Sequence, residues 1–188
     1  MNRFHRWACR SSWWKKTVES KLLPWALKGV DLGPDLLEVG PGPGLTTDLL
    51  RQRASRLTAI EIDARLADAL KQRMQGTNVT VVEGDATRMP FETGSFSAAV
   101  SFTMLHHVPS SDLQDRLLAE VSRVLQPGGV FVGTDSTWSR TFQLMHLFDT
   151  MVLVDPSTLG KRLEAAGFRD VSIKQGEGAF CFRARRPN

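Results

Sequence analysis

The residues best suited to bind a ligand form a turn of alternating glycines, Gly40, Gly42 and Gly44. Glycines let a ligand approach the main chain closely because they carry no Cβ. The turn lacks the Gly-Lys-Ser or Gly-Lys-Thr ending of a triphosphate-binding P-loop, and its third glycine comes one place too early for the dinucleotide fingerprint. Pro41 and Pro43 also remove two backbone donors that a diphosphate would use. The turn therefore predicts a ligand with a nucleoside and no diphosphate.

Two acidic residues after later apolar runs strengthen this interpretation. Glu61 ends the run 57–61 about twenty residues past the turn, where doubly wound folds place an acid that accepts both ribose hydroxyls. Asp85 follows the run 79–82, and its carboxylate can accept from the exocyclic amine of an adenine while the Ala86 N–H donates to a ring nitrogen. The alternatives are an exposed acid at the end of a strand for Glu61 and a helix cap for Asp85.

Adjacent histidines, His106 and His107, follow the apolar segment 96–102. An imidazole titrates near neutrality, so either residue can act as a base toward a substrate hydroxyl. The alternative is that both position the loop or contact the cofactor. Cys9 and Cys181 have no metal-ligand spacing, so we expect free thiols and no metal site.

Hydrophobic periodicity predicts the elements that position these residues. Apolar strands alternate with amphipathic helices, which indicates an α/β, doubly wound fold whose strand ends meet at one crevice. We expect strands at 36–39, 57–61, 79–82, 96–102 and 130–134, helices around 45–50, 66–74, 113–125 and 159–166, and a hairpin at 171–174 and 179–183.

The chain is expected to form one domain, since 188 residues with 41% hydrophobic and 23% charged side chains leave no room for a separate substrate domain. Within it, residues 1–32 are expected to form a helical cap on a core at 33–188. The irregular, aromatic segment 135–155 is either the part that faces the substrate or one buried helix. Neither a signal peptide nor a membrane span is apparent, which predicts a soluble cytoplasmic protein.

The N-terminal segment is basic and amphipathic, with Trp7, Trp14, Val18, Leu22 and Trp25 at helical spacings between lysines and arginines. We expect this stripe to dock on the domain and cover the ligand. The alternative is peripheral contact with a membrane, because tryptophans beside basic residues suit the headgroup interface. The formal net charge of +4 is most simply a solvated surface, although basic patches also suit nucleic acid or acidic substrates.

Taken in order, these motifs resemble those of the class I S-adenosylmethionine-dependent methyltransferases, of the small-molecule "methyltransferase type 11" kind. The resemblance runs from about Leu36 to the C-terminus. The run Leu105–Val108 resembles the ubiquinone and menaquinone biosynthesis type, whereas Ser97 stands where the family usually has aspartate. The motifs are Glu38 with the three glycines, Glu61, Gly84-Asp85-Ala86 and Pro127-Gly128-Gly129.

The resemblance implies a Rossmann-like, mostly parallel seven-stranded sheet with an antiparallel last strand. It also implies an enzyme that transfers a methyl group from S-adenosylmethionine to a small-molecule or lipid-like acceptor and leaves S-adenosylhomocysteine, through positioning of the reactants. Met89 is expected beside the adenine. The other cofactor-binding residues implied are Glu38, Gly40, Pro41, Gly42, Gly44, Glu61, Ile62, Asp85, Ala86 and Ser101.

Three alternative functions remain. The ribosomal RNA adenine dimethylases share the first motifs, but Ser101–Met104 stands where they carry an Asn-Leu-Pro-Tyr type motif, which makes a nucleic-acid acceptor unlikely. A nicotinamide-dependent oxidoreductase is disfavoured by the glycine spacing, the length and the absence of tyrosine. A non-catalytic binding protein is disfavoured by Glu61 and Asp85, which a decayed cofactor site would not need to keep. The acceptor and the oligomeric state stay open.

Overall fold

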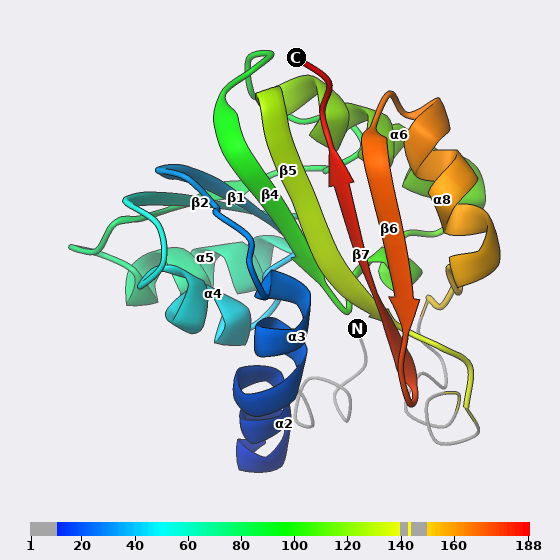
Figure 1. Ribbon diagram of the computed structural model, residues 1–188. Coiled ribbons are helices and arrows are strands. Elements are labelled where there is room, and N and C mark those ends of the chain that lie inside the picture. The colour runs from blue at the N-terminus through cyan, green and yellow to red at the C-terminus, as the bar shows by residue number, and fades with distance from the viewer. Residues whose placement is uncertain (1–10, 140–142, 144–149) are drawn as a thin grey trace.

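The computed structural model describes residues 11–139, 143 and 150–188, which form a twisted seven-stranded sheet with helices on both faces (Figure 1). The strand order is β3-β2-β1-β4-β5-β7-β6. β1 to β5 pair in parallel, whereas β7 is antiparallel to both of its neighbours. The predicted Rossmann-like sheet with its antiparallel last strand is thus confirmed. The strands are β1 (Asp35–Val39), β2 (Arg56–Glu61), β3 (Val79–Glu83), β4 (Phe96–Phe102), β5 (Leu125–Ser136), β6 (Arg169–Gln175) and β7 (Ala179–Arg185).

Short polar side chains begin several of the helices. Asp63, Ser110 and Asp155 each accept a hydrogen bond from a backbone N–H of the first turn, which satisfies donors that have no partner inside the helix. The helices are α2 (Ser12–Thr17), the π-helical η1 (Val18–Leu22), α3 (Leu23–Leu27), α4 (Leu45–Leu50), α5 (Ala64–Arg73), the 3₁₀ turn η2 (Leu105–His107), α6 (Ser111–Val124) and α8 (Pro156–Ala165).

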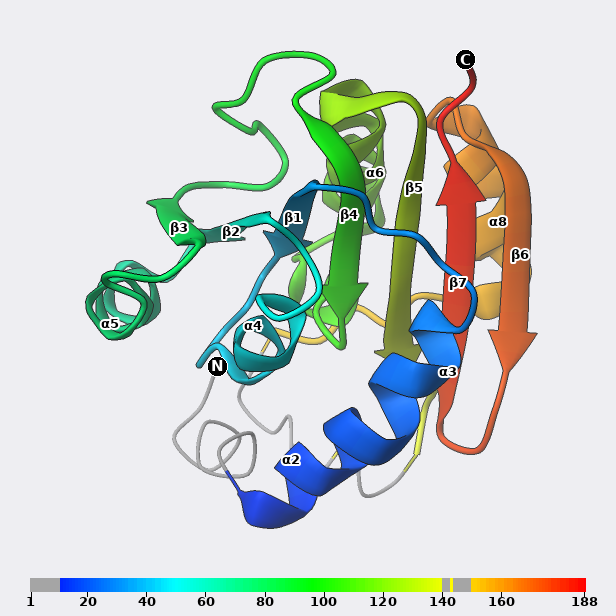
Figure 2. The same ribbon diagram turned by 60° about the vertical axis from the view of Figure 1, so that its left-hand side comes forward.

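The two faces of the sheet have separate apolar layers because side chains alternate along each strand. On β5, Phe131 packs in the layer of α6 and α8, whereas Val130 and Val132 pack in the layer of the N-terminal helices. α5 covers the β2–β3 side, where Leu70 lies against Val81. Figure 2 shows α2 and α3 on the face opposite α6 and α8.

The N-terminal helices α2, η1 and α3 follow one another without a break and are called here the helical arm, residues 12–27. The last of the three, α3, has Pro24 in its first turn. Val18, Leu22 and Leu23 are buried in the same apolar layer as β4 and β5. The predicted stripe residue Trp7 lies outside the described residues.

Two predicted boundaries differ in the structure. The helix before Pro127 ends at Val124, and β5 begins at Leu125, so the Pro-Gly-Gly motif lies inside a strand. The pairing with β4 shifts register at this point, which accommodates a residue without a backbone N–H. Of the segment 135–155, residues 140–142 and 144–149 lie outside the described part, and so does Cys9.

The described residues contain no cluster of three or more His, Cys, Asp or Glu side chains that could hold a metal ion. Cys181 is a free, buried thiol. Within the same residues, no helix has both the length and the apolar character needed to cross a bilayer.

Candidate functional site

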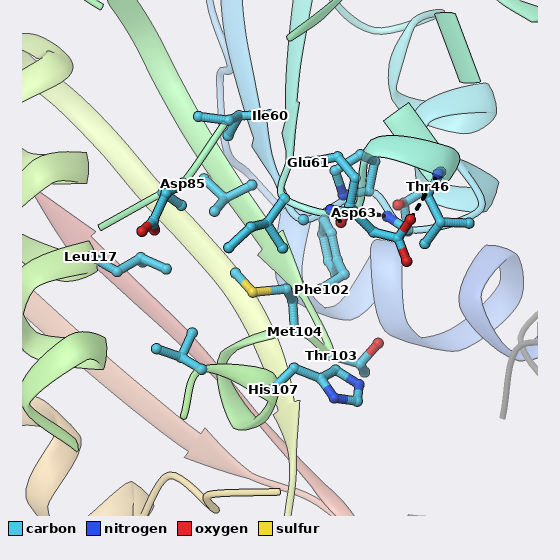
Figure 3. Close-up of a pocket in the computed structure, with 18 of the residues that line it drawn as sticks. Thr46, Ile60, Glu61, Asp63, Asp85, Phe102, Thr103, Met104, His107 and Leu117 are labelled. Carbon is cyan, nitrogen blue, oxygen red and sulfur yellow. Dashed lines mark hydrogen bonds between the residues drawn. The ribbon is translucent and has the colours of Figure 1, made fainter. Parts of the chain in front are cut away.

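A cavity of about 370 Å³ opens at the carboxyl ends of β1 to β4 (Figure 3). Loops after parallel strands meet at this edge, which is where open α/β sheets bind ligands. The helical arm contributes Trp14 and Val18 to the cavity wall. The rest of the wall comes from the ends of β1, β2 and β4, the glycine turn, the turn after β3, the segment from Thr103 to Pro109, the first turns of α6, and Thr150.

The glycine turn presents its main chain to the cavity. Gly42 has φ +54°, and a Cβ there would meet no atom within 4 Å, so this position is open to a ligand. Gly40 is constrained in a different way, because a Cβ would lie 2.2 Å from Cγ of Met104. Pro41 also lines the cavity, but Gly44 does not: it precedes α4 with φ +80°.

Glu38 lies beneath this turn, 1% exposed, and is absent from the cavity wall. Its carboxyl group accepts hydrogen bonds from the hydroxyls of Thr46 and Thr47, the second at 2.6 Å. Burial raises the pKa of Glu38 from 4.5 to about 7, although the two hydroxyl bonds lower it. The role of Glu38 visible here is to join the end of β1 to the start of α4.

Arg73, which the sequence analysis did not single out, holds the turn from the side of α5. Its Nη2 donates to the carbonyl oxygens of Pro43 (2.9 Å) and Gly44 (3.1 Å), and its Nη1 donates to the carboxylate of Asp48. The planar guanidinium presents donors on two terminal nitrogens at a fixed spacing, which suits these three acceptors better than the single nitrogen of an ammonium.

Glu61 lines the cavity and orients the turn at the same time. Its Oε2 accepts from the N–H of Gly42 at 2.9 Å, and its Oε1 accepts from the N–H of Asp63 at 3.0 Å. Each carboxylate oxygen can accept two hydrogen bonds, so these bonds leave acceptor capacity for ligand hydroxyls. The next residue, Ile62, is 71% exposed and also lines the cavity, an unusual position for a large apolar side chain.

Asp85 and Ala86 lie on the cavity wall after β3. Asp85 is exposed, and its Oδ1 accepts from the N–H of Thr87 at 2.8 Å, which closes a local turn, but no helix begins there, so the predicted helix cap is absent. Two other residues that were predicted to bind the cofactor do not line the cavity. Met89 is buried and its N–H donates to Glu120, while Ser101 is fully buried inside β4, away from the cavity.

The turn after β4 is strained at the cavity edge. Thr103 has φ +50°, which is an outlier for a β-branched residue. Its N–H donates to the carbonyl oxygen of Thr134 at 2.8 Å, and this bond holds the turn against β5. Backbone strain of this kind concentrates at functional sites. Figure 3 shows Thr103, Met104 and His107 together on one side of the cavity, across from Glu61.

The two histidines have different environments. His107 lines the cavity, and its Nδ1 lies 3.3 Å from the carbonyl oxygen of Thr150. His106 is buried beside the fully buried Asp135, whose carboxylate accepts from both the ring Nδ1 and the backbone N–H of His106. The carbonyl oxygen of His106 accepts from Val152, so this residue connects both ends of the segment 136–151.

Comparison with known proteins identifies related sequences. A family model described as "Methyltransferase domain" matches residues 37–133, just over half of the chain. A fatty-acid O-methyltransferase of Mycolicibacterium smegmatis is 32% identical over 106 residues, which are 55% of this chain and 38% of that protein. A probable ribosomal RNA small subunit methyltransferase A of Thermococcus onnurineus is 45% identical over 56 residues, 30% of this chain and 21% of that protein. The chain thus matches well under half the length of these relatives.

The fold is also found in solved structures. Phosphoethanolamine N-methyltransferase 2 of Haemonchus contortus, solved with phosphomonomethylethanolamine and S-adenosylhomocysteine, aligns with a TM-score of 0.72 and 15% identity. The alignment covers 100% of this chain and 61% of that one. At this identity the likeness establishes a common fold.

Proposed function

Because the chain belongs to the methyltransferase-domain family, it is a class I enzyme that uses S-adenosylmethionine, and we propose that its acceptor is a small, apolar, lipid-like molecule. The observation behind this proposal is the composition of the cavity wall beside the glycine turn. Trp14, Val18, Phe102 and Met104 line it there. A wall of this kind favours an apolar ligand, since burial of apolar surface is stabilising.

The RNA alternative is weaker. The ribosomal RNA methyltransferase matches cover short parts of both chains, whereas the fatty-acid O-methyltransferase match covers more of this chain. The turn after β4 also lacks the Asn-Leu-Pro-Tyr type of motif. An apolar acceptor therefore remains the preferred proposal.

The wall residues fit the cofactor. We assign the main chain of Gly40 and Gly42 to its methionine part, because Gly42 is open toward the cavity, and Glu61 to the ribose hydroxyls. Asp85 and Ala86 are assigned to the adenine. Other predicted residues support the site from outside the wall: Glu38 and Gly44 shape the turn, and Ser101 and Met89 belong to the packed interior.

The cofactor supplies a methyl group on positively charged sulfur, and the protein contributes orientation and, where the acceptor must lose a proton, a base. We propose His107 for that base. A carbonyl oxygen can only accept, so we assign a proton to Nδ1, which faces Thr150; when His107 acts as a base, Nε2 is then the nitrogen that takes the proton of the acceptor. His106 is assigned the positioning of His107, since their ring centroids lie 4.3 Å apart.

The helical arm and the segment 135–155 are assigned to the acceptor side. Trp14 and Val18 of the arm line the cavity, as does Thr150. In this proposal residues 1–32 form the cap, residues 33–188 form the core, and the cap closes one wall of the acceptor site.

Calorimetric titration with S-adenosylhomocysteine tests the cofactor assignment. Glu61→Gln and Asp85→Asn should each weaken binding by about tenfold or more, because a hydrogen bond to a charged group contributes about 1.5–3 kcal/mol. Glu83→Gln is the matched control, since Glu83 is exposed at the end of β3 and absent from the cavity wall. Equal affinity in all three variants contradicts the assignment.

The acceptor is tested by release of S-adenosylhomocysteine with long-chain fatty acids, isoprenoid quinols and an RNA transcript as candidate acceptors. His107→Asn should lower kcat about 100-fold or more with an oxygen acceptor and leave the cofactor Kd unchanged. Methylation of the RNA alone would reject the apolar acceptor.

A further inference from the structure

The helical arm exposes a large aromatic side chain beside the cavity. Trp13 is 72% exposed, whereas its neighbour Trp14 lines the cavity, and the two ring centroids are 6.2 Å apart. Burial of an aromatic side chain is normally favourable, so an exposed tryptophan next to a ligand cavity is a candidate for contact with a partner. One helical turn thus has an inner face toward the cavity and an outer face toward solvent.

The outer face is positively charged. Lys15 and Lys16 of α2 are exposed directly after the two tryptophans. From residue 11 to residue 28 the chain has four lysines and a single acidic residue, Glu19. A partner of this face is therefore expected to carry negative charge.

A second exposed tryptophan lies at the same edge of the sheet. Trp138 is 60% exposed and follows the carboxyl end of β5 by two residues. Figure 2 shows that α2 lies beyond the carboxyl ends of β4 and β5. Trp13, Lys15, Lys16 and Trp138 are called here the docking face.

We propose that the docking face binds the surface of an anionic lipid bilayer, so that an apolar acceptor passes from the membrane into the cavity beside Trp14. Tryptophan rings prefer the headgroup level of a bilayer, and lysines near an anionic surface add attraction. The inference rests on the proposed apolar acceptor, which such a membrane would supply. Few groups take part, so binding is reversible and weakens as salt screens the lysines.

Sedimentation of the full chain with lipid vesicles tests this proposal. Vesicles of phosphatidylcholine and phosphatidylglycerol in a 3:1 ratio should bind the protein, and pure phosphatidylcholine vesicles should bind it at least about tenfold more weakly. The double variant Lys15→Glu/Lys16→Glu and the variant Trp13→Ser should each lower binding to the anionic vesicles by about tenfold or more. Lys71→Glu reverses the charge of one exposed lysine of α5, away from the arm, and should bind as the wild type does.

Each variant is also titrated with S-adenosylhomocysteine, and an unchanged Kd shows that the cofactor site is intact. Equal vesicle binding by the arm variants and the α5 control overturns the docking face. Binding of an RNA oligonucleotide that is lost in the arm variants, without vesicle binding, overturns it in favour of nucleic acid. Failure of the wild type to bind S-adenosylhomocysteine rejects the cofactor assignment, whereas the vesicle result decides the docking face independently.

Discussion

Glu38 shows how the chemistry of one residue is set by its surroundings. Its carboxyl group is enclosed between β1 and α4, where burial raises its pKa from 4.5 to about 7. A group with a raised folded-state pKa contributes stability below its unfolded pKa, and this contribution is lost as pH rises through the folded pKa. The shift predicts that the ionisation of Glu38 lowers the free energy of unfolding by about 2.5 kcal/mol between pH 5 and pH 8.

The variant Glu38→Gln removes this titration while keeping a polar group beside the two threonines. We expect E38Q to gain stability relative to the wild type as pH rises, by about 2.5 kcal/mol from pH 5 to pH 8, measured by urea unfolding. Glu164→Gln, at an exposed position of α8, serves as the control. Parallel pH profiles for wild type and E38Q would show that Glu38 does not titrate in this range.

The residues of the cavity wall could be predicted from the sequence where they come directly after a predicted strand. Gly40, Gly42, Glu61 and Asp85 line one cavity, as the ends of parallel strands require. The residues that hold the site in place were not predictable from the sequence. Arg73 donates to Gly44 across 29 residues, and Asp135 accepts from His106 across 29 residues. Their signal is three-dimensional, and one sequence does not contain it.

Helix α5 stabilises the glycine turn through Arg73. The side chain makes hydrogen bonds to two turn carbonyls and to Asp48, so Arg73→Met should loosen the turn. We expect the Kd for S-adenosylhomocysteine to rise about tenfold, since one lost charge-assisted hydrogen bond corresponds to that factor or more. Calorimetry measures this change.

Two further variants show whether the Kd rises because a charge is lost or because the hydrogen bonds of the guanidinium are lost. Lys71→Met removes a positive charge from the same helix at an exposed position and should leave the Kd unchanged. Arg73→Lys keeps the positive charge but loses the forked pair of terminal nitrogens, so its Kd should lie between those of the wild type and Arg73→Met. If all three variants bind with the same Kd, the turn does not depend on Arg73.

The elements themselves were largely predicted from periodicity, and the exceptions have physical causes. The sequence analysis began the next strand at residue 130, after Pro127-Gly128-Gly129, because proline and glycine usually separate two elements. In the structure the helix ends at Val124 and pairing with β4 begins at Leu125. Pairing with β4 therefore outweighs the turn signal of Pro127-Gly128-Gly129, and such long-range pairing cannot be read from a single sequence.

The molecule as a whole depends on the helical arm for part of its core. Leu23 is 1% exposed and packs in the layer of β4 and β5. Leu23→Ala should lower the free energy of unfolding by about 3 kcal/mol, because the buried side chain beyond Cβ is removed and a cavity remains. Trp13→Ser on the same arm should change it by less than about 0.5 kcal/mol, since Trp13 is exposed. Urea unfolding that gives equal values for the two variants would contradict the docked arm.

Arg183 of β7 donates to the carbonyl oxygens of Lys28 (2.9 Å) and Ala26 (3.4 Å), across 155 and 157 residues. A chain emerging from the ribosome presents the arm long before β7 has been made. Until β7 pairs with β5, the arm has neither these hydrogen bonds nor its complete apolar layer, and the wall formed by Trp14 and Val18 is not fixed. The cavity is therefore finished late in synthesis, so a nascent chain without β7 is not expected to hold a ligand there.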